Sequence, residues 1–462
     1  MSDMPEREVR SVVDQCADCE QCREMMTEGC PFFPELYRLF DREKEKSLPI
    51  TLGDLRSLVE LCNFCGLCPC PDVRARIMEA KSAFIKRDGM PLSIRLIQDV
   101  EKLGRYLNRL PGPIRALLKA GVTSKIIKKT FGIHQDRVLP EVPCQDFSAW
   151  AREMGICYIP PGNNAEENKV AYFAGCTARY FFPEVAMSAV RVLQKNRVAV
   201  FIPPQKCCSM PALLEGGESF TRKLMSHNLY HLMDAVECGY DPVCSCPTCG
   251  YLFKKVLREK ACYAPQYQKL VGGDDTFMLV PEESCTDPPQ ETRHRRVHRS
   301  MYSGILKDDG VFSSLSPLKR IEIARKTFDL GEYLFNLYRE GKLETGFSPV
   351  NRTIAYYPPC HTREQNIGLP YSELLSQIPG LKVLVVQGSY LCCGMAGIMG
   401  CKKDFHHKSL EMAEPLLQKI RDMNPDILVT ECLSCRLQFM QTLPFPQAHP
   451  VEILSEAYSL TD

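Results

Sequence analysis

Short apolar runs recur in two separate regions of the chain, and they predict strands. Helix-like stretches separate the runs, which is the pattern of α/β proteins. In the first region the runs are KVAYFA at 169–174, VAVFIP at 198–203 and PVCS at 242–245. In the second region they are TIAYY at 353–357, KVLVV at 382–386 and DILVT at 426–430. The pattern therefore predicts two α/β units of similar design.

A cysteine element accompanies the end of each run. The first region has Cys176, the adjacent pair Cys207–Cys208, and Cys246-x-x-Cys249; the second has Cys360, the pair Cys392–Cys393, and Cys432-x-x-Cys435. Equivalent positions are offset by 184, 185 and 186 residues, which indicates an internal duplication. Because open α/β sheets place their sites at the carboxyl ends of parallel strands, each set of thiols is predicted to gather there. Adjacent cysteines suit a metal cluster, whose different irons they can reach, rather than a disulfide framework.

The N-terminal part of the chain carries a different cysteine pattern. Cys16-x-x-Cys19-x-x-Cys22 precedes Cys30-Pro31, and Cys62-x-x-Cys65-x-x-Cys68 precedes Cys70-Pro71. In two-cluster ferredoxins the cysteine before proline binds the other cluster. That logic predicts two [4Fe–4S] clusters, one held by Cys16, Cys19, Cys22 and Cys70 and the other by Cys62, Cys65, Cys68 and Cys30. The spacing before each Cys-Pro is irregular, which leaves the crossed assignment open, and a pair of Cys₄ zinc sites is the alternative. Between the motifs, residues 35–61 have helical spacing of apolar side chains.

Composition indicates a reducing setting for these thiols. The chain has 462 residues, 25 of them cysteine, with 45% hydrophobic content and a formal net charge of +1. This length allows two or three packed domains, and the near-neutral charge favours no nucleic-acid partner. The N-terminus has no apolar segment of the secretory type, and no apolar run is long enough to predict a membrane span. We expect a cytoplasmic protein whose cysteines are metal ligands.

Two basic segments lie outside the cysteine motifs. Residues 102–129 carry eight Lys or Arg and no acid, and Pro111 and Pro113 divide them into two short helices. Such amphipathic helices can lie on an anionic membrane surface, dock a partner subunit or pack on their own domain, and these alternatives stay open. The run Arg293–Arg299 lies in an irregular stretch, 258–320, and is predicted to be a solvated linker, because no nucleic-acid motif accompanies it.

The repeated order of single cysteine, cysteine pair and CxxC resembles the CCG cysteine-rich domain of heterodisulfide reductase subunits and their electron-transfer relatives. The segments PPCHTREQ, CCGMAGIMGCKKDF, VTECLSCRLQF and FGIHQDRVLP are most similar to the iron–sulfur C subunits of anaerobic glycerol-3-phosphate dehydrogenases. The resemblance implies a fold of α+β and α/β parts. In this division, a helical, ferredoxin-like domain with two [4Fe–4S] clusters would span residues 1–100, and basic helices with a connector would span 101–168. The first CCG domain would span 169–290, a linker and helix 291–350, and the second CCG domain 351–462.

The resemblance also implies one iron–sulfur cluster in each CCG domain, of the non-cubane [4Fe–4S] type in heterodisulfide reductases. The ligands would be Cys176, Cys207, Cys208, Cys246 and Cys249 in the first domain, and Cys360, Cys392, Cys393, Cys432 and Cys435 in the second. The first copy departs from the motif at Ser209, where the second has Gly394. His361 follows Cys360 directly and is a candidate hydrogen-bond donor or proton source beside the second cluster. The other cysteines are interpreted as small buried hydrophobes: Cys144, Cys157, Cys238, Cys244, Cys262, Cys285 and Cys401.

These features predict an iron–sulfur electron-transfer subunit. It would take electrons from a flavoprotein dehydrogenase subunit and pass them through its clusters to a quinone or another carrier, because the chain has no evident flavin or nicotinamide motif of its own. Two alternatives remain. The CCG pair could itself reduce a disulfide or a quinone, which would make the subunit an oxidoreductase in its own right. The chain could also be a scaffold that anchors a dehydrogenase peripherally at the cytoplasmic membrane face through residues 102–129.

Overall fold

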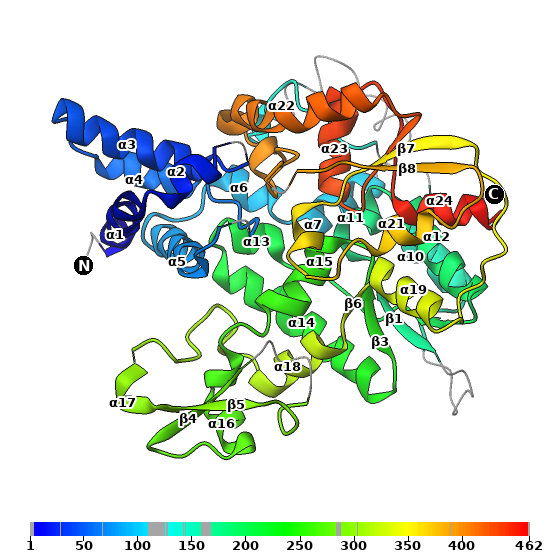
Figure 1. Cartoon of the computed structure of the whole chain (residues 1–462), viewed down its shortest axis with the longest axis horizontal. Helices are drawn as coiled ribbons and strands as arrows, with labels where there is room; N and C mark the ends of the chain where they lie inside the picture. Colours follow the sequence, from blue (N-terminus) through cyan, green and yellow to red (C-terminus); the bar gives the residue numbers. More distant parts are fainter. Residues whose placement is uncertain are drawn as a thin grey trace.

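The computed structural model of the chain describes residues 4–460 except 28, 67, 110–124, 126–127, 142, 144, 159–167, 283–287, 303 and 389. It comprises a helical N-terminal region, two α/β units with parallel sheets, and an antiparallel ribbon that projects from the first unit (Figure 1). Within these described ranges, no helix has the length and apolar character needed to cross a membrane.

The N-terminal region is a bundle of helices around its own apolar core. The longest helices, α1 and α5, pack against each other, and Val12, Leu36, Leu58 and Phe84 lie fully buried between the helices. The helices of this region are α1 (Met4–Cys19), α2 (Gln21–Met25), α3 (Phe32–Lys46), α4 (Leu52–Val59), α5 (Pro71–Asp88), α6 (Leu92–Ile97) and α7 (Val100–Asn108).

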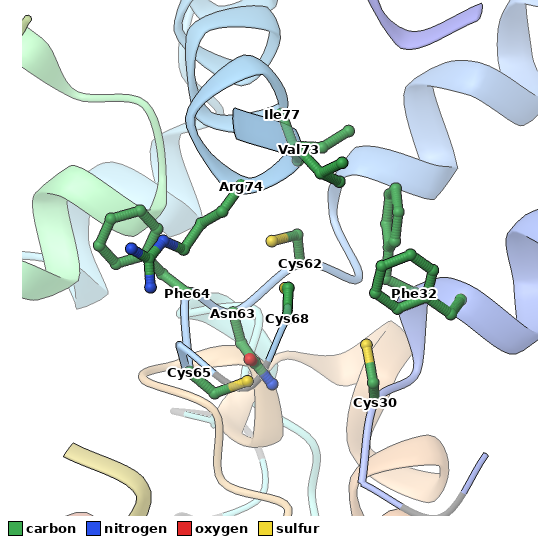
Figure 2. A pocket seen from close by; sticks show the side chains of 11 residues that line it. Cys30, Phe32, Cys62, Asn63, Phe64, Cys65, Cys68, Val73, Arg74 and Ile77 are labelled. Atoms are coloured by element: carbon green, nitrogen blue, oxygen red, sulfur yellow. The ribbon is translucent and has the colours of Figure 1, made fainter. Parts of the chain in front are cut away.

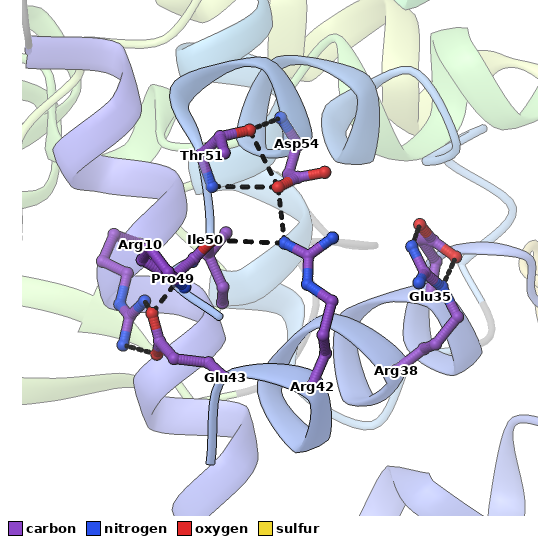
Figure 3. Close-up of polar contacts among 9 residues, drawn as sticks. All are labelled: Arg10, Glu35, Arg38, Arg42, Glu43, Pro49, Ile50, Thr51 and Asp54. Carbon is purple, nitrogen blue, oxygen red and sulfur yellow. Dashed lines mark hydrogen bonds and ion pairs between the residues drawn. The ribbon is translucent and has the colours of Figure 1, made fainter. Parts of the chain in front are cut away.

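The helical stretch predicted at 35–61 is two helices, because the chain turns between α3 and α4. Ser47 takes a left-handed conformation with φ of 52° at the end of α3, and Thr51 begins α4 with a capping box closed by Asp54. Arg42 on α3 reaches across the turn to Asp54 at 2.6 Å (Figure 3). The same close-up shows Glu43 paired with Arg10 of α1 at 2.7 Å. These contacts fix the angle between the first helices.

The first α/β unit is built on four parallel strands in the order β2-β1-β3-β6. They are β1 (Lys169–Phe173), β2 (Ala199–Phe201), β3 (Asp241–Cys244) and β6 (Phe328–Asp329). The main helices around this sheet are α11 (Gly175–Tyr180), α12 (Pro183–Lys195), α13 (Met210–Leu214), α14 (Glu218–Glu237), α15 (Pro247–Tyr251), a π-helical turn η1 (Leu252–Val256), α18 (Pro317–Lys326) and α19 (Leu330–Arg339).

The second unit repeats this topology, with its strands in the order β8-β7-β9-β10 and every pair parallel. The strands are β7 (Arg352–Tyr356), β8 (Leu381–Val385), β9 (Ile427–Val429) and β10 (Gln447–Ala448). The helices are α20 (Cys360–Arg363), α21 (Pro370–Leu375), η3 (Met399–Cys401), η4 (Lys403–Phe405), α22 (His406–Met423), α23 (Leu433–Thr442) and α24 (Pro450–Ala457). The six predicted strands are all present, each within a few residues of its apolar run.

One hydrophobic core serves both units. Val170, Val243, Ile354 and Val429, from β1, β3, β7 and β9, belong to a single cluster of buried side chains. Helix α12 of the first unit packs on α24 of the second, and α19 packs on α21. Helix α10 (Phe147–Glu153) covers the first unit through Phe147, which is fully buried. The two sheets therefore have fixed positions relative to each other.

The predictions of an irregular stretch at 258–320 and of a linker with a helix at 291–350 are each wrong in one place. The run Arg293–Arg299 contains a strand, β5 (His294–His298), which pairs antiparallel with β4 (Phe277–Pro281) in the projecting ribbon. The short helices next to this ribbon are η2 (Ala261–Tyr263), α16 (Pro265–Val271) and α17 (Arg299–Tyr302). Further along, β6 completes the first sheet and α19 belongs to the common core, so the first unit extends well past residue 290. The strand β5 reads His-Arg-Arg-Val-His, which gives no apolar run from which it could be predicted.

The connector before the first unit is attached to the second unit. Ile133 forms an isolated bridge with Lys402, and the His134 amide donates to the Cys401 carbonyl oxygen at 3.1 Å. Arg137, with no exposed surface, donates to the carbonyl oxygen of Gly400 at 2.9 Å. Of the basic segment 102–129, helix α7 is described, and Pro111 and Pro113, predicted to divide two helices, lie outside the described residues.

Candidate functional site

One set of N-terminal thiols surrounds a small pocket between α3 and α5 (Figure 2). Its lining includes Cys30 together with Cys62, Cys65 and Cys68, and the aromatic ring of Phe32 closes one side. The structure thus brings the cysteine before Pro31 to the second CxxCxxC motif, as the crossed arrangement requires. Burial raises the pKa of Cys30, and the nearby Cys65 raises it further. The backbone amides of Phe33 and Phe32 donate to the Cys30 sulfur and oppose this rise.

The other N-terminal set gathers near the end of α1. Burial raises the pKa of Cys16 to about 12, and the thiols of Cys22, Cys70 and Cys19 add to the shift through their own charges. Cys70, which precedes α5, is therefore close to the first CxxCxxC motif rather than to its own. The Tyr37 hydroxyl donates to the Cys16 carbonyl oxygen at 3.1 Å and holds this end of α1 in place.

In the first α/β unit, the thiols meet at the carboxyl ends of β1 and β3. The Cys176 and Cys207 sulfurs are 3.4 Å apart. Side-chain hydrogen bonding with Cys207, and then with Cys249, lowers the pKa of the Cys208 thiol despite its complete burial. Gly175 allows this approach: its φ is +72°, and a Cβ there would lie 3.1 Å from the Cys249 sulfur.

The second unit repeats the geometry with its own thiols. Cys392 and Cys435 donate hydrogen bonds to Cys393 and lower its pKa well below the ordinary value. The Gly394 amide donates to the Cys392 sulfur at 3.4 Å. Thus the second cysteine of each adjacent pair contacts the second cysteine of each CxxC, in both copies. Amide donors of this kind stabilise charged sulfur and tune cluster potentials.

Both sets of thiols open onto one cavity of about 810 Å³. Every cysteine of the two five-cysteine sets lines it except Cys207, and Cys65 of the N-terminal region lines it too. The cavity therefore joins the thiols of three parts of the chain. The remaining wall is mostly apolar, contributed by α6, α7, residues 131–140 and the loop after Cys393. Neither the shared cavity nor its apolar wall could be inferred from cysteine spacing.

His361 lies where the three parts meet. Its Nδ1 is 2.9 Å from the Thr248 hydroxyl of the first unit, and its Nε2 is 3.3 Å from the Phe64 carbonyl oxygen of the N-terminal region. The ring stacks on Tyr251 at 4.8 Å between centroids. Burial lowers the pKa of His361 to about 4, so the imidazole is neutral at neutral pH. Both ring nitrogens have protein partners, an arrangement that favours positioning of the cysteine loops over proton supply.

Two charged residues near the thiols carried no sequence signal. Arg137 is fully buried, donates to the Gln438 side-chain oxygen at 2.6 Å, and contributes to the lowered pKa of Cys393 after the thiol hydrogen bonds. Glu101 on α7 accepts a hydrogen bond from the Cys207 amide at 3.1 Å and pairs with Arg105 at 2.5 Å. Each is distant in sequence from the cysteines that it approaches, so only the fold reveals the contact.

The donor sets fit iron–sulfur clusters. The Cys30 set lines a small pocket, and all but one of the cysteines of the two five-cysteine sets line the larger cavity. Apolar walls, buried sulfur and backbone amide donors are the surroundings that cluster thiolates require. Helices begin at or next to Cys70, Cys246, Cys360 and Cys432, and the positive end of a helix dipole favours negative charge.

The cysteines outside these sets differ in their surroundings. Cys244 is fully buried in β3, and burial raises its thiol pKa; Cys401 lines the cavity, and burial raises its pKa as well. Cys238 is exposed, unlike the buried hydrophobe predicted for it, whereas Cys157 and Cys262 are half-buried. Cys144 and Cys285 lie outside the described residues.

Comparison with known proteins agrees with this duplicated architecture. The chain matches the CCG cysteine-rich domain at residues 170–254 and again at 354–440. It is similar to the C subunit of the anaerobic glycerol-3-phosphate dehydrogenase of Escherichia coli strain K12, with 24% identity over 347 residues that cover 75% of this chain and 69% of the relative.

Two other relatives come from different systems. Lactate utilization protein A of Halalkalibacterium halodurans is 21% identical over 294 residues, covering 62% of this chain and 96% of the relative. The D subunit of the dihydromethanophenazine:CoB–CoM heterodisulfide reductase of Methanosarcina acetivorans is 22% identical over 293 residues, covering 62% of this chain and 57% of the relative. The similarity thus extends over proteins whose names refer to different substrates.

Proposed function

This chain contains two CCG cysteine-rich domains, and from that premise we propose that it is the iron–sulfur electron-transfer subunit of a dehydrogenase complex. A flavoprotein subunit, of the glycerol-3-phosphate dehydrogenase kind or a related one, supplies the electrons. Two [4Fe–4S] clusters in the ferredoxin-like N-terminal region and one iron–sulfur cluster in each CCG domain carry them to a quinone or another carrier. Similarity to a subunit of anaerobic glycerol-3-phosphate dehydrogenase and to a subunit of heterodisulfide reductase supports this role.

The observation that carries the proposal is the convergence of thiols on the shared cavity. Cys65, of the set with Cys30, lines the same space as Cys360 and Cys176. Clusters held by these sets would be neighbours, so an electron that reaches the N-terminal region has a short route to both CCG domains. Iron–sulfur clusters would supply one-electron redox chemistry there. The protein residues position the sulfurs, exclude water from them and donate hydrogen bonds to them.

A catalytic role is the second candidate, and the size of the cavity favours it. About 810 Å³ lies within the range of small-molecule sites, although clusters would take up part of it. A subunit that only relayed electrons would need no space beyond that taken up by its clusters. The acceptor could therefore react inside this chain. Attachment to the cytoplasmic membrane face through residues 102–129 stays a prediction, since most of that segment lies outside the described residues.

Metal analysis after anaerobic purification tests the electron-transfer role. We expect iron and acid-labile sulfide in equal amounts, about sixteen irons per chain for four four-iron clusters, and EPR signals that appear on reduction. About eight irons would restrict the clusters to the N-terminal region. Stoichiometric zinc without sulfide would contradict the proposal altogether.

A further inference from the structure

Part of the wall of the cavity is apolar. Val100, Leu103 and Leu107 of α7 line it, together with Ile133 and Leu139 of the connector. The three residues of α7 follow i, i+3, i+7 spacing and so form one face of that helix. An apolar helix face normally packs against other side chains. Here Val100 packs in part against the core of the first unit, and the face as a whole borders a space large enough for a ring and an apolar chain.

Helix α7 is held firmly in this position. Glu101 accepts a hydrogen bond from the Cys207 amide, and a Cβ at Gly104 would lie 2.5 Å from the Tyr180 side chain, so α7 and α11 approach very closely. The opposite face of α7 carries Lys102, Arg105 and Tyr106, all exposed. One helix thus presents apolar side chains to the cavity and basic and aromatic side chains to solvent.

The cavity also has a buried polar group without a partner. The side chain of Asn63, in a residue with 9% of its surface exposed, lines both this cavity and the small pocket of the Cys30 set, and its Nδ2 has no hydrogen-bond partner among the described residues. A buried amide donor left unpaired costs free energy. A ligand carbonyl oxygen in the cavity would satisfy it. The occupant therefore needs a redox-active head with carbonyl acceptors and an apolar remainder.

We propose that this cavity binds a lipophilic quinone, with its carbonyl ring between the thiol sets and Asn63 and its isoprenoid tail along Val100, Leu103 and Leu107. This inference rests on the proposed function, whose clusters supply the electrons. The quinone takes up two electrons from the reduced iron–sulfur centres and two protons from water, and it leaves as the quinol. Both carbonyl oxygens become hydroxyl groups in this reaction, and the centres are reoxidised.

Substitutions on two faces of α7 test the site in the full chain with its clusters. Protein reduced with dithionite is mixed with menadione or with decylubiquinone, and reoxidation of the clusters is followed by stopped-flow absorbance. We expect saturation with quinone concentration. Leu103→Trp, which fills the cavity, should raise the half-saturating concentration at least about tenfold. The matched control Tyr106→Trp, on the exposed face of the same helix, should stay within twofold. Asn63→Leu should weaken binding of both quinones.

The outcomes separate this inference from the proposed function. Reoxidation by ferricyanide, a small outer-sphere oxidant, should be unchanged in Leu103→Trp, because the clusters themselves remain. If Leu103→Trp and Tyr106→Trp bind quinone equally well, the cavity is not the quinone site. Saturable reoxidation by a small organic disulfide that Leu103→Trp also blocks, with quinones reacting only non-saturably, would assign the cavity to a disulfide instead. If dithionite reduces no cluster at all, the result contradicts the proposed function itself and not only the quinone site.

Discussion

A single residue after each cysteine pair shows how the two copies have diverged. Ser209 and Gly394 occupy equivalent positions, and both have φ of +81°. This left-handed conformation suits glycine and strains other residues. Ser209 is fully buried as well, and its hydroxyl has no partner among the described residues. In the second copy the space is closed, because a Cβ at Gly394 would overlap the Ser409 carbonyl oxygen.

Exchanging these residues should therefore have opposite effects on stability. Ser209→Gly relieves backbone strain and removes a buried unpaired hydroxyl, so we expect the free energy of unfolding to rise by about 1 kcal/mol. Gly394→Ser meets a backbone carbonyl and should lower it by about 3 kcal/mol or more. Urea unfolding of the cluster-loaded protein measures both. Gly310→Ser, at an open position with nothing within 4 Å, is the control and should be nearly neutral.

At the scale of elements, a buried set of charges ties the three parts of the chain together. Lys402, beside η3 of the second unit, pairs with Glu215 of the first unit at 2.5 Å and with Glu60 of the N-terminal region at 3.2 Å. Lys81 of α5 pairs with Glu60 at 3.4 Å. Desolvation alone would raise the pKa of Glu60. The charges of Lys81 and, next, of Lys402 outweigh it and lower that pKa to about 2. The network lies close to the cysteine loops of each part and would keep their separations constant.

Removing one member of this network should lower the free energy of unfolding far more than breaking an exposed ion pair does. Lys402→Met leaves Glu215 buried without its cation, and we expect the free energy of unfolding to fall by about 4 kcal/mol. Adding Glu215→Gln to that variant removes the stranded charge and should restore at least about 1 kcal/mol. Arg421→Met breaks the exposed pair with Glu414 and should cost no more than about 0.5 kcal/mol. Equal losses for Lys402→Met and Arg421→Met would contradict the role of the network.

Whether a strand could be predicted from the sequence depended on its length and on how many of its faces are buried. Strands β1 and β7 are covered on both faces, so they read as continuous apolar runs and were found. Strands β6 and β10 have two residues each, too few for any pattern, and were missed. Likewise, local spacing predicted the cysteine sets, whereas Arg137 reaches the second set only through the fold. Side chains far apart in sequence leave no periodic signal when they meet.

For the whole molecule, the cysteine sets follow one another in space from the N-terminal helices to the cavity. The set with Cys30 borders the cavity between the units through Cys65, while the set with Cys16 lies at the end of α1. Electrons arriving at the N-terminal helices would thus meet the Cys16 set first and the Cys30 set next. In both N-terminal sets, the cysteine before proline lies near the motif other than its own.

Paired alanine substitutions test that crossing. If Cys30 belongs with Cys62, Cys65 and Cys68, then Cys30→Ala and Cys30→Ala/Cys62→Ala should lose the same cluster, about four irons per chain, and the same EPR signal. Cys30→Ala/Cys16→Ala should lose about eight irons and two signals. Cys238→Ala, at an exposed cysteine outside all sets, controls for general damage and should keep the full iron content. The crossed assignment is wrong if Cys30→Ala/Cys16→Ala loses no more iron than Cys30→Ala alone, since both cysteines would then hold one cluster.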